Sequence, residues 1–374
     1  MRLIHDCRIM LLLPVLLLSS CSVGGNLPSN PVAQTGTKPA PPLKLVEPAE
    51  LPGELNGTDY KNMDADELFV TGRAAAAQGM YNVAAIAQYW YFRKTNSGRY
   101  DLACFLARSA QIDPAFYWIQ KAAIDEGVNT PHALRDEDLE SLRADNRWNQ
   151  VLSYLEECNR YFETAGIAET VMILPRGYLK STAIPAVVWM HGASSRPSNF
   201  VNEATQELVD QLNVALIGVS GTKPRGPQSF VWAEDVEKDS ERIRAALTQV
   251  SDRVNIEKGK VINFGFSQGA QVGLEVAVKY PEEFAGAIVL SPGATSHLQS
   301  ITPSPLLAHR GFVISYGALE RLGNVNLAKN ANDWLRHANA QVNYHPYPDV
   351  SDHSFPVDFG ERFPEWVRFI LNTK

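Results

Sequence analysis

Residues 265–269 have the types and spacing of a serine nucleophile and its supporting turn. They read Gly-Phe-Ser-Gln-Gly, after the mainly apolar residues 261–264 and before an amphipathic stretch at 271–280. A glycine on each side of the serine, two positions away, permits a sharp strand-to-helix turn that larger side chains would block. The start of the following helix adds free backbone N–H groups and a positive dipole. We therefore predict Ser267 as the nucleophile of an acyl-transfer reaction.

A serine hydroxyl is a weak nucleophile until a general base accepts its proton. Five histidines follow Ser267 in the chain: His297, His309, His337, His345 and His353. His353 lies in a loop between a strand expected at 342–344 and a helix expected at 361–371. This position agrees with the order serine, acid, histidine that accompanies a nucleophile on such a turn. His353 is the predicted base.

The base needs a carboxylate that orients its ring and stabilises the imidazolium ion. Glu320 follows a strand expected at 311–315 and stands three residues after a glycine, so we predict it as the acid. Asp349 and Asp352 are alternatives because they lie close to His353 in the sequence.

An oxyanion needs backbone N–H donors on two sides. Gln268, directly after the nucleophile, is one predicted donor. The second is Ala193, in the loop after the strand expected at 186–190. His191 in the same loop is expected to hold backbone rather than to catalyse.

Two aromatic residues follow another expected strand end. Phe230 and Trp232 lie in the segment 221–232 and are predicted to form an apolar wall of the substrate site. The alternative is that both side chains anchor this loop on the core.

From residue 166 onward, short apolar runs alternate with helical patterns. Strands are expected at 170–174, 186–190, 214–219, 261–264, 287–290, 312–315 and 342–344. Helices are expected at 235–250, 268–280, 327–338 and 361–371. Such alternation predicts an α/β domain over 166–374, with a mostly parallel sheet flanked by helices. Functional loops in these sheets gather at the carboxyl ends of the strands.

Residues 265–270 and 280–291 together resemble the phospholipase/carboxylesterase branch of the α/β-hydrolase superfamily, with dienelactone-hydrolase-like enzymes nearby. The resemblance implies the α/β-hydrolase fold and a serine esterase that cleaves small-molecule or lipid esters with a Ser-His-acid triad and no cofactor. Two residues depart from the family pattern: Ala270 replaces a common third glycine, and Glu320 replaces the commoner aspartate. A lipid-anchored scaffold with an inactive hydrolase domain, or a peptidase or amidase of the same fold, is the alternative.

Residues 60–165 have apolar residues at helical spacing and no convincing strand, which predicts a small all-α domain. The stretch 100–148 resembles a degenerate tetratricopeptide-like repeat, and that resemblance implies a protein partner. A plain helical bundle is the alternative.

Residues 1–20 have the features of an export signal. Arg2 and Arg8 precede an apolar run at 9–18. This run is shorter than the roughly 20 residues that span a membrane. The run ends in Leu-Ser-Ser-Cys, which resembles a bacterial lipobox. The resemblance implies lipid on Cys21 and, with Ser22 next, an outer-membrane protein facing the periplasm. An ordinary signal peptide or a short membrane anchor is the alternative.

Residues 21–59 are rich in proline, with glycines and serines between the prolines, so we predict a lipidated cysteine followed by an extended linker. Beyond this segment the chain has two further cysteines, Cys104 and Cys158. An exported protein could pair them in a disulfide, and two buried thiols are the alternative.

The composition excludes some functional classes. The 374-residue chain is 45% hydrophobic and 20% charged, with a formal net charge of −7 and no long basic run. Nucleic-acid binding is therefore disfavoured, because phosphate contacts need a basic face. The histidines and cysteines lack metal-ligand spacing, so no metal site is predicted.

Overall fold

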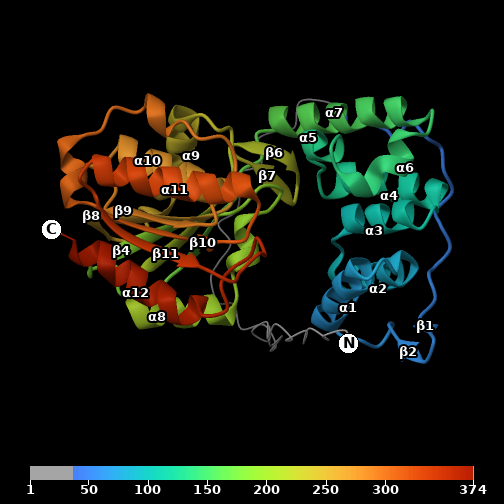
Figure 1. Cartoon of the computed structure of the whole chain (residues 1–374), viewed down its shortest axis with the longest axis horizontal. Helices are drawn as coiled ribbons and strands as arrows, with labels where there is room; N and C mark the ends of the chain where they lie inside the picture. The colour runs from blue at the N-terminus through green and yellow to red at the C-terminus, as the bar shows by residue number, and fades with distance from the viewer. Residues whose placement is uncertain (1–36, 374) are drawn as a thin grey trace, which may run out of the picture. The chain divides into compact units, whose positions relative to one another are not determined.

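The computed structural model describes residues 37–373, which form two compact units (Figure 1). One contains residues 37–168 and 223–230, and the other contains residues 169–222 and 231–373. The predicted signal segment and Cys21 lie outside the described residues. Within residues 37–373, no helix is both long enough and apolar enough to cross a membrane.

The first unit is built from helices, as predicted for this part of the chain. They are α1 (Ala65–Ala77), α2 (Tyr81–Thr95), α3 (Arg99–Arg108), α4 (Ile112–Asp125), α5 (Thr130–Ala133), η1 (Glu137–Leu139), α6 (Glu140–Arg143) and α7 (Trp148–Thr164). Asp64 caps α1 in a capping box with Glu67. Alanines fill much of the buried core and let neighbouring helices pack closely. The tetratricopeptide resemblance and a protein partner for this unit stay predictions.

A buried ion pair ties the start of α3 to the end of α4. The Arg99 guanidinium donates to the Glu126 carboxylate at 2.6 Å, and the Arg99 backbone N–H donates to the same carboxylate at 3.1 Å. Burial raises the pKa of Glu126, and its bonds with Arg99 oppose that rise. These bonds link the first residue of α3 to the residue that directly follows α4.

Residues 37–59, the described part of the predicted linker, pack on the helical unit. Four leucines of this segment pack against the helical core: Leu43, Leu45, Leu51 and Leu55. The Leu43 backbone N–H donates to Gln120 Oε1 at 3.0 Å, and Trp90 Nε1 donates to the Pro52 carbonyl at 2.9 Å. A short antiparallel hairpin precedes α1; its strands are β1 (Glu54–Leu55) and β2 (Thr58–Asp59). Proline content predicted the extended backbone, but a leucine at every few positions gives that backbone an apolar side to bury.

Cys104 on α3 and Cys158 on α7 are free thiols, and both are buried. Burial raises the pKa of each thiol. The structure therefore favours two buried thiols over the disulfide.

We expect these thiols to react with Ellman's reagent at least about a hundredfold more slowly in native protein than in denaturant, because a buried, protonated thiol is a poor nucleophile. The measurement uses a chain that starts at Ser22, without reductant. Two reactive thiols in denaturant confirm the prediction, and none there would indicate a disulfide.

The second unit is a seven-stranded sheet in the order β11-β10-β9-β8-β4-β5-β3. Its strands are β3 (Thr170–Ile173), β4 (Ile184–Met190), β5 (Ala215–Val219), β8 (Ile256–Phe266), β9 (Gly286–Leu290), β10 (Gly311–Gly317) and β11 (Gln341–Tyr347). All neighbours pair parallel except β3 and β5, which pair antiparallel. Every strand expected from the sequence is present.

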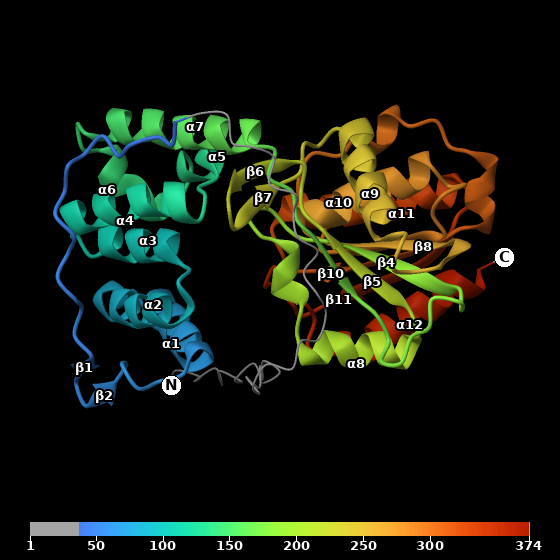
Figure 2. The ribbon, with the colours of Figure 1, turned by 180° about the vertical axis from the view of Figure 1, so that it is seen from behind.

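Helices cover both faces of this sheet (Figures 1 and 2). On one face lie α9 (Val236–Val250), α10 (Gln268–Lys279) and α11 (Leu322–His337); on the other lie α8 (Glu203–Leu212) and α12 (Phe359–Asn372). Short 3-10 turns complete the unit: η2 (Pro197–Phe200), η3 (Leu298–Ser300) and η4 (Pro305–His309). Each face has its own apolar core. A mostly parallel sheet flanked by helices, after an all-helical region, confirms the predicted fold class.

One pair of strands leaves the second unit and belongs mainly to the first. The strands are β6 (Lys223–Gly226) and β7 (Ser229–Val231), which form a small sheet of their own. Gly226 and Gly127 allow the two backbones to touch, because a Cβ on Gly226 would lie 2.2 Å from the Glu126 carbonyl oxygen. The Arg225 guanidinium also pairs with Glu163 of α7. The predicted boundary at residue 165 did not foresee this return of the chain.

Candidate active site

Ser267 occupies the sharp turn between β8 and α10. Its backbone has φ 56° and ψ −121°, a strained conformation for a residue with a side chain. A Cβ on Gly265 would lie 2.2 Å from the Gly269 carbonyl oxygen, and a Cβ on Gly269 would lie 2.4 Å from the Met190 carbonyl oxygen. The two glycines are therefore required by close backbone approach, as the sequence pattern predicted.

Three predicted residues meet at the carboxyl end of the sheet. His353 Nε2 lies 2.9 Å from Ser267 Oγ, and His353 Nδ1 lies 2.7 Å from Glu320 Oε2. Ser267 follows β8, Glu320 follows β10, and His353 lies in the loop between β11 and α12. With the Nδ1–H donating to Glu320, the free Nε2 lone pair accepts the serine hydroxyl. This arrangement can remove the proton of Ser267.

Glu320 is the carboxylate that contacts His353. Its side chain is fully buried and also accepts hydrogen bonds from Ser291 Oγ at 2.7 Å, the Gly317 N–H at 2.9 Å and Asn324 Nδ2 at 3.1 Å. Burial alone would raise the pKa of Glu320, but these bonds together with that from His353 lower it to about 2. Glu320 is therefore ionised at neutral pH.

The two alternative acids do not occupy this position. Within residues 37–373, no hydrogen bond joins Asp349 or Asp352 to His353, although both are close to it in sequence. Asp352 contributes its backbone carbonyl to the loop instead, accepting the Ser354 N–H at 3.0 Å.

The His353 ring is supported by aromatic neighbours. Its centroid lies 4.8 Å from that of Phe266, which in turn lies 5.0 Å from Phe355. The side chain remains 36% exposed. The His353 ring is thus held from one side and exposed to solvent on another.

The two predicted oxyanion donors lie in segments next to the nucleophile. Gln268 is the first residue of α10, so its backbone N–H has no acceptor within the helix. A Cβ on Gly192 would lie 3.3 Å from the Ser267 Cβ, which places the loop that contains Ala193 against the nucleophile. The donor role of both residues stays a prediction.

His191 has the backbone-holding contacts that the sequence suggested. Its Nε2 accepts the Gly221 N–H at 2.8 Å, and its Nδ1 lies 2.6 Å from the Gly192 carbonyl oxygen. Complete burial lowers its pKa to about 4. The ring is therefore neutral near pH 7 and holds the loop after β4.

The predicted aromatic wall is not present. Phe230 and Trp232 are only 1% and 2% exposed, so neither side chain offers surface to a substrate. The alternative holds for Trp232, which packs in the apolar core beside the sheet. Two aromatics in a loop predict apolar surface, and the sequence carries no signal for which side of the loop they face.

The structure also adds side chains that the sequence reasoning missed. Ser291 and Asn324 both donate to Glu320, and the Gln268 side chain donates to Glu234 Oε1 at 2.8 Å. Asn324 stands four residues after Glu320, a separation short enough to have suggested the contact. Ser291 follows a different strand, so only the fold reveals it.

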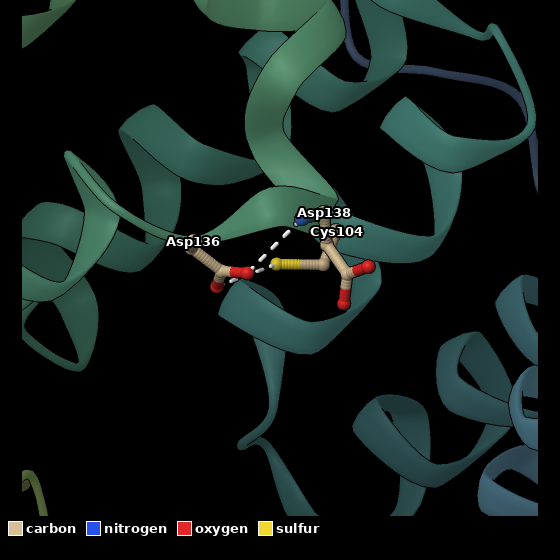
Figure 3. Close-up of side chains that lie close together, drawn as sticks. All are labelled: Cys104, Asp136 and Asp138. Atoms are coloured by element: carbon tan, nitrogen blue, oxygen red, sulfur yellow. Dashed lines mark hydrogen bonds between the residues drawn. The ribbon is translucent and has the colours of Figure 1, made fainter.

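A second group of polar side chains lies in the helical unit. The Cys104 sulfur and one carboxylate oxygen each of Asp136 and Asp138, atoms that can bind a metal ion, lie within 4.8 Å of one another (Figure 3). The Cys104 thiol points at Asp136, with Sγ 3.8 Å from Oδ2, and Asp136 also caps η1 through the Asp138 N–H. Tyr100 donates to the same carboxylate at 2.8 Å. With a protonated thiol and a carboxylate already satisfied by protein donors, the group has the contacts of a helix cap.

Comparison with known proteins gives a family match within the sheet unit. Residues 180–361 match the family model described as Phospholipase/Carboxylesterase. No curated protein matches the chain.

Solved structures to which this chain is similar include a carboxylesterase from Bacillus cereus, at 17% identity and TM-score 0.44, covering 57% of this chain and 99% of the other. An uncharacterised Bacillus cereus protein has 16% identity and TM-score 0.44, covering 83% of this chain and 100% of the other. A ferulic acid esterase from Anaeromyces mucronatus has 14% identity and TM-score 0.42, covering 54% of this chain and 85% of the other.

Proposed function

We propose that the protein hydrolyses carboxylic esters with Ser267 as nucleophile, because residues 180–361 match the family model described as Phospholipase/Carboxylesterase. The observation that carries the proposal is the hydrogen-bonded chain from Ser267 through His353 to Glu320. A scaffold with an idle hydrolase domain has no need to maintain this chain. The intact chain therefore favours the enzyme.

The reaction follows two acyl-transfer steps. His353 accepts the Ser267 proton as the serine oxygen attacks the ester carbonyl, and the N–H groups of Gln268 and Ala193 stabilise the oxyanion. The tetrahedral intermediate collapses, and the His353 imidazolium protonates the leaving alcohol. A water molecule then loses a proton to His353, attacks the acyl-enzyme and releases the carboxylic acid and Ser267.

Each residue has a role that its surroundings support. The strained turn presents the Ser267 hydroxyl, and the buried, ionised Glu320 stabilises the imidazolium ion that forms in both steps. Small-molecule or lipid esters are the proposed substrates.

Covalent labelling tests the proposal directly. We expect a fluorophosphonate probe to label native protein at one residue, and peptide mass spectrometry to locate the adduct on Ser267. Heat-denatured protein is the control, because an unactivated serine does not react. Folded protein without an adduct at Ser267 would refute the serine-hydrolase proposal.

We further propose that lipid on Cys21 anchors the protein at the bacterial cell envelope, on the outer membrane facing the periplasm. The support is the apolar run at 9–18 that ends in Leu-Ser-Ser-Cys, with Ser22 next. Several acyl chains on one residue give stable anchoring. Fractionation of cells that express wild type or Cys21→Ser is the test, and an anchored Cys21→Ser protein would contradict it.

A further inference from the structure

Trp232 connects the two segments that contain the proposed oxyanion donors. Its indole Nε1 donates to the His191 carbonyl oxygen at 2.9 Å, at the end of β4 and two residues before Ala193. Its backbone N–H donates to Gln268 Oε1 at 3.0 Å, on the residue that follows the nucleophile. A single buried residue therefore holds both segments.

The Gln268 side chain completes this connection. Its Nε2 donates to the Trp232 carbonyl oxygen at 3.4 Å and to Glu234 Oε1 at 2.8 Å. Gln268 is itself 7% exposed, so these bonds are made away from bulk water. A side chain bonded to both the N–H and the C=O of one residue cannot rotate without losing both.

The two segments are also in direct contact, which makes their relative position sensitive to small shifts. A Cβ on Gly269 would lie 2.5 Å from the His191 carbonyl oxygen, the same oxygen that accepts the Trp232 indole. The indole N–H thus bonds to an atom against which the nucleophile turn packs.

We propose that Trp232, together with the Gln268 side chain, is a positioning residue that sets the spacing of the two oxyanion donors. The inference rests on the proposed function, since it assumes that Gln268 and Ala193 donate to an oxyanion. Trp232 is buried and does not touch substrate. Its effect is to hold backbone N–H groups where negative charge develops, because preorganised donors stabilise the transition state more than the bound ester.

The chain offers a matched control. Trp189 in β4 is also buried, at 3% exposure, and its Nε1 has no hydrogen-bond partner among the described residues. Trp232→Phe and Trp189→Phe remove the same atoms from the core of the same unit. Only the first removes a hydrogen bond to the oxyanion loop.

The experiment measures kcat and KM of the full-length protein on an activated aryl ester, with inhibition by an alkylboronic acid. A boronic acid forms a tetrahedral, negatively charged adduct with an active serine and so reports on the oxyanion donors. We expect Trp232→Phe to lower kcat about tenfold and to weaken boronate inhibition by a similar factor, with KM within about twofold of wild type. Trp189→Phe should match wild type in all three.

A second variant serves if Trp232→Phe does not fold. Gln268→Met keeps the backbone N–H and side-chain length but removes the bonds to Trp232 and Glu234. It should lower kcat to a similar extent, and the double variant should lose less than the product of the two factors, because both changes break one connection.

The outcomes separate the inference from the proposed function. Equal kcat in Trp232→Phe and Trp189→Phe, with active wild type, overturns the positioning role and leaves the esterase intact. Fully multiplicative effects in the double variant also overturn it. Wild type with neither turnover nor labelling at Ser267 overturns both proposals.

Discussion

Replacing Ser267 with alanine is expected to lower kcat for ester hydrolysis by about 10⁴- to 10⁶-fold, the range found when serine hydrolases lose their nucleophile. The change removes only Oγ, the atom that lies 2.9 Å from His353 Nε2. Without it no acyl-enzyme forms, and the remaining groups can only assist direct attack by water. The measurement is steady-state hydrolysis of an activated aryl ester.

The control for this variant is the same substitution at an exposed serine. Ser300 lies on a short 3-10 turn, and its hydroxyl bonds to the His297 carbonyl. Ser300→Ala should keep wild-type turnover. Both variants should melt within a few degrees of wild type. Residual activity of Ser267→Ala above about 1% would show that another residue is the nucleophile.

Replacing Glu320 with glutamine is expected to lower kcat by about 10³- to 10⁴-fold, comparable to the loss when the triad acid of a serine protease becomes its amide. The amide cannot stabilise the imidazolium ion, and its N–H₂ group favours the wrong ring tautomer of His353. Ester hydrolysis across pH 5 to 9 is the measurement. The kcat of Glu320→Gln should stay below that of wild type across this range, because the wild-type Glu320 is ionised throughout it.

Matched variants at the alternative acids decide the assignment. Asp349→Asn and Asp352→Asn should retain kcat within about threefold, because the structure gives neither carboxylate a bond to His353. A large loss of kcat in either variant, together with an active Glu320→Gln, would show that the acid is an aspartate in the loop that contains His353.

The depressed pKa of Glu320 also has a consequence for stability. A carboxyl whose pKa falls to about 2 on folding stabilises the folded state fully above its unfolded pKa near 4.5, and this contribution is lost as pH falls toward 2. The contribution is roughly 3 kcal/mol at neutral pH.

Urea unfolding of wild type and Glu320→Gln at pH 7, 4 and 3 measures this contribution. The stability difference between the two proteins should shrink as the pH falls, because glutamine cannot be protonated in this range. A difference that stayed constant from pH 7 to pH 3 would contradict the low pKa.

Local sequence patterns were sufficient to predict the turn that contains Ser267 and the fold class. Glycines two residues before and after Ser267 reflect backbone contacts within a few residues, so their reason is visible in the sequence. Alternating apolar runs and helical patterns likewise record which side of each element is buried. The parallel sheet follows from their order, because parallel strands need a helical crossover between them.

Residues 37–59, within the predicted linker at 21–59, show what composition does not predict. Proline content described the backbone of these residues correctly, but Leu43, Leu45, Leu51 and Leu55 pack on helices that follow later in the chain. Burial of an extended segment depends on a surface that another part of the sequence supplies.

By itself, the sequence determined the sharp turn at Ser267, the helical first region and the alternating sheet, since each depends on spacing along one segment. Only the tertiary structure decided which carboxylate contacts His353 and on which side Trp232 lies. Glu320 reaches the base across 33 residues and is held by Ser291 from another strand. Trp232 bonds to His191 and Gln268, 41 and 36 residues away. Such contacts arise because parallel strands bring their carboxyl ends to one edge, and no local pattern records which side chains meet there.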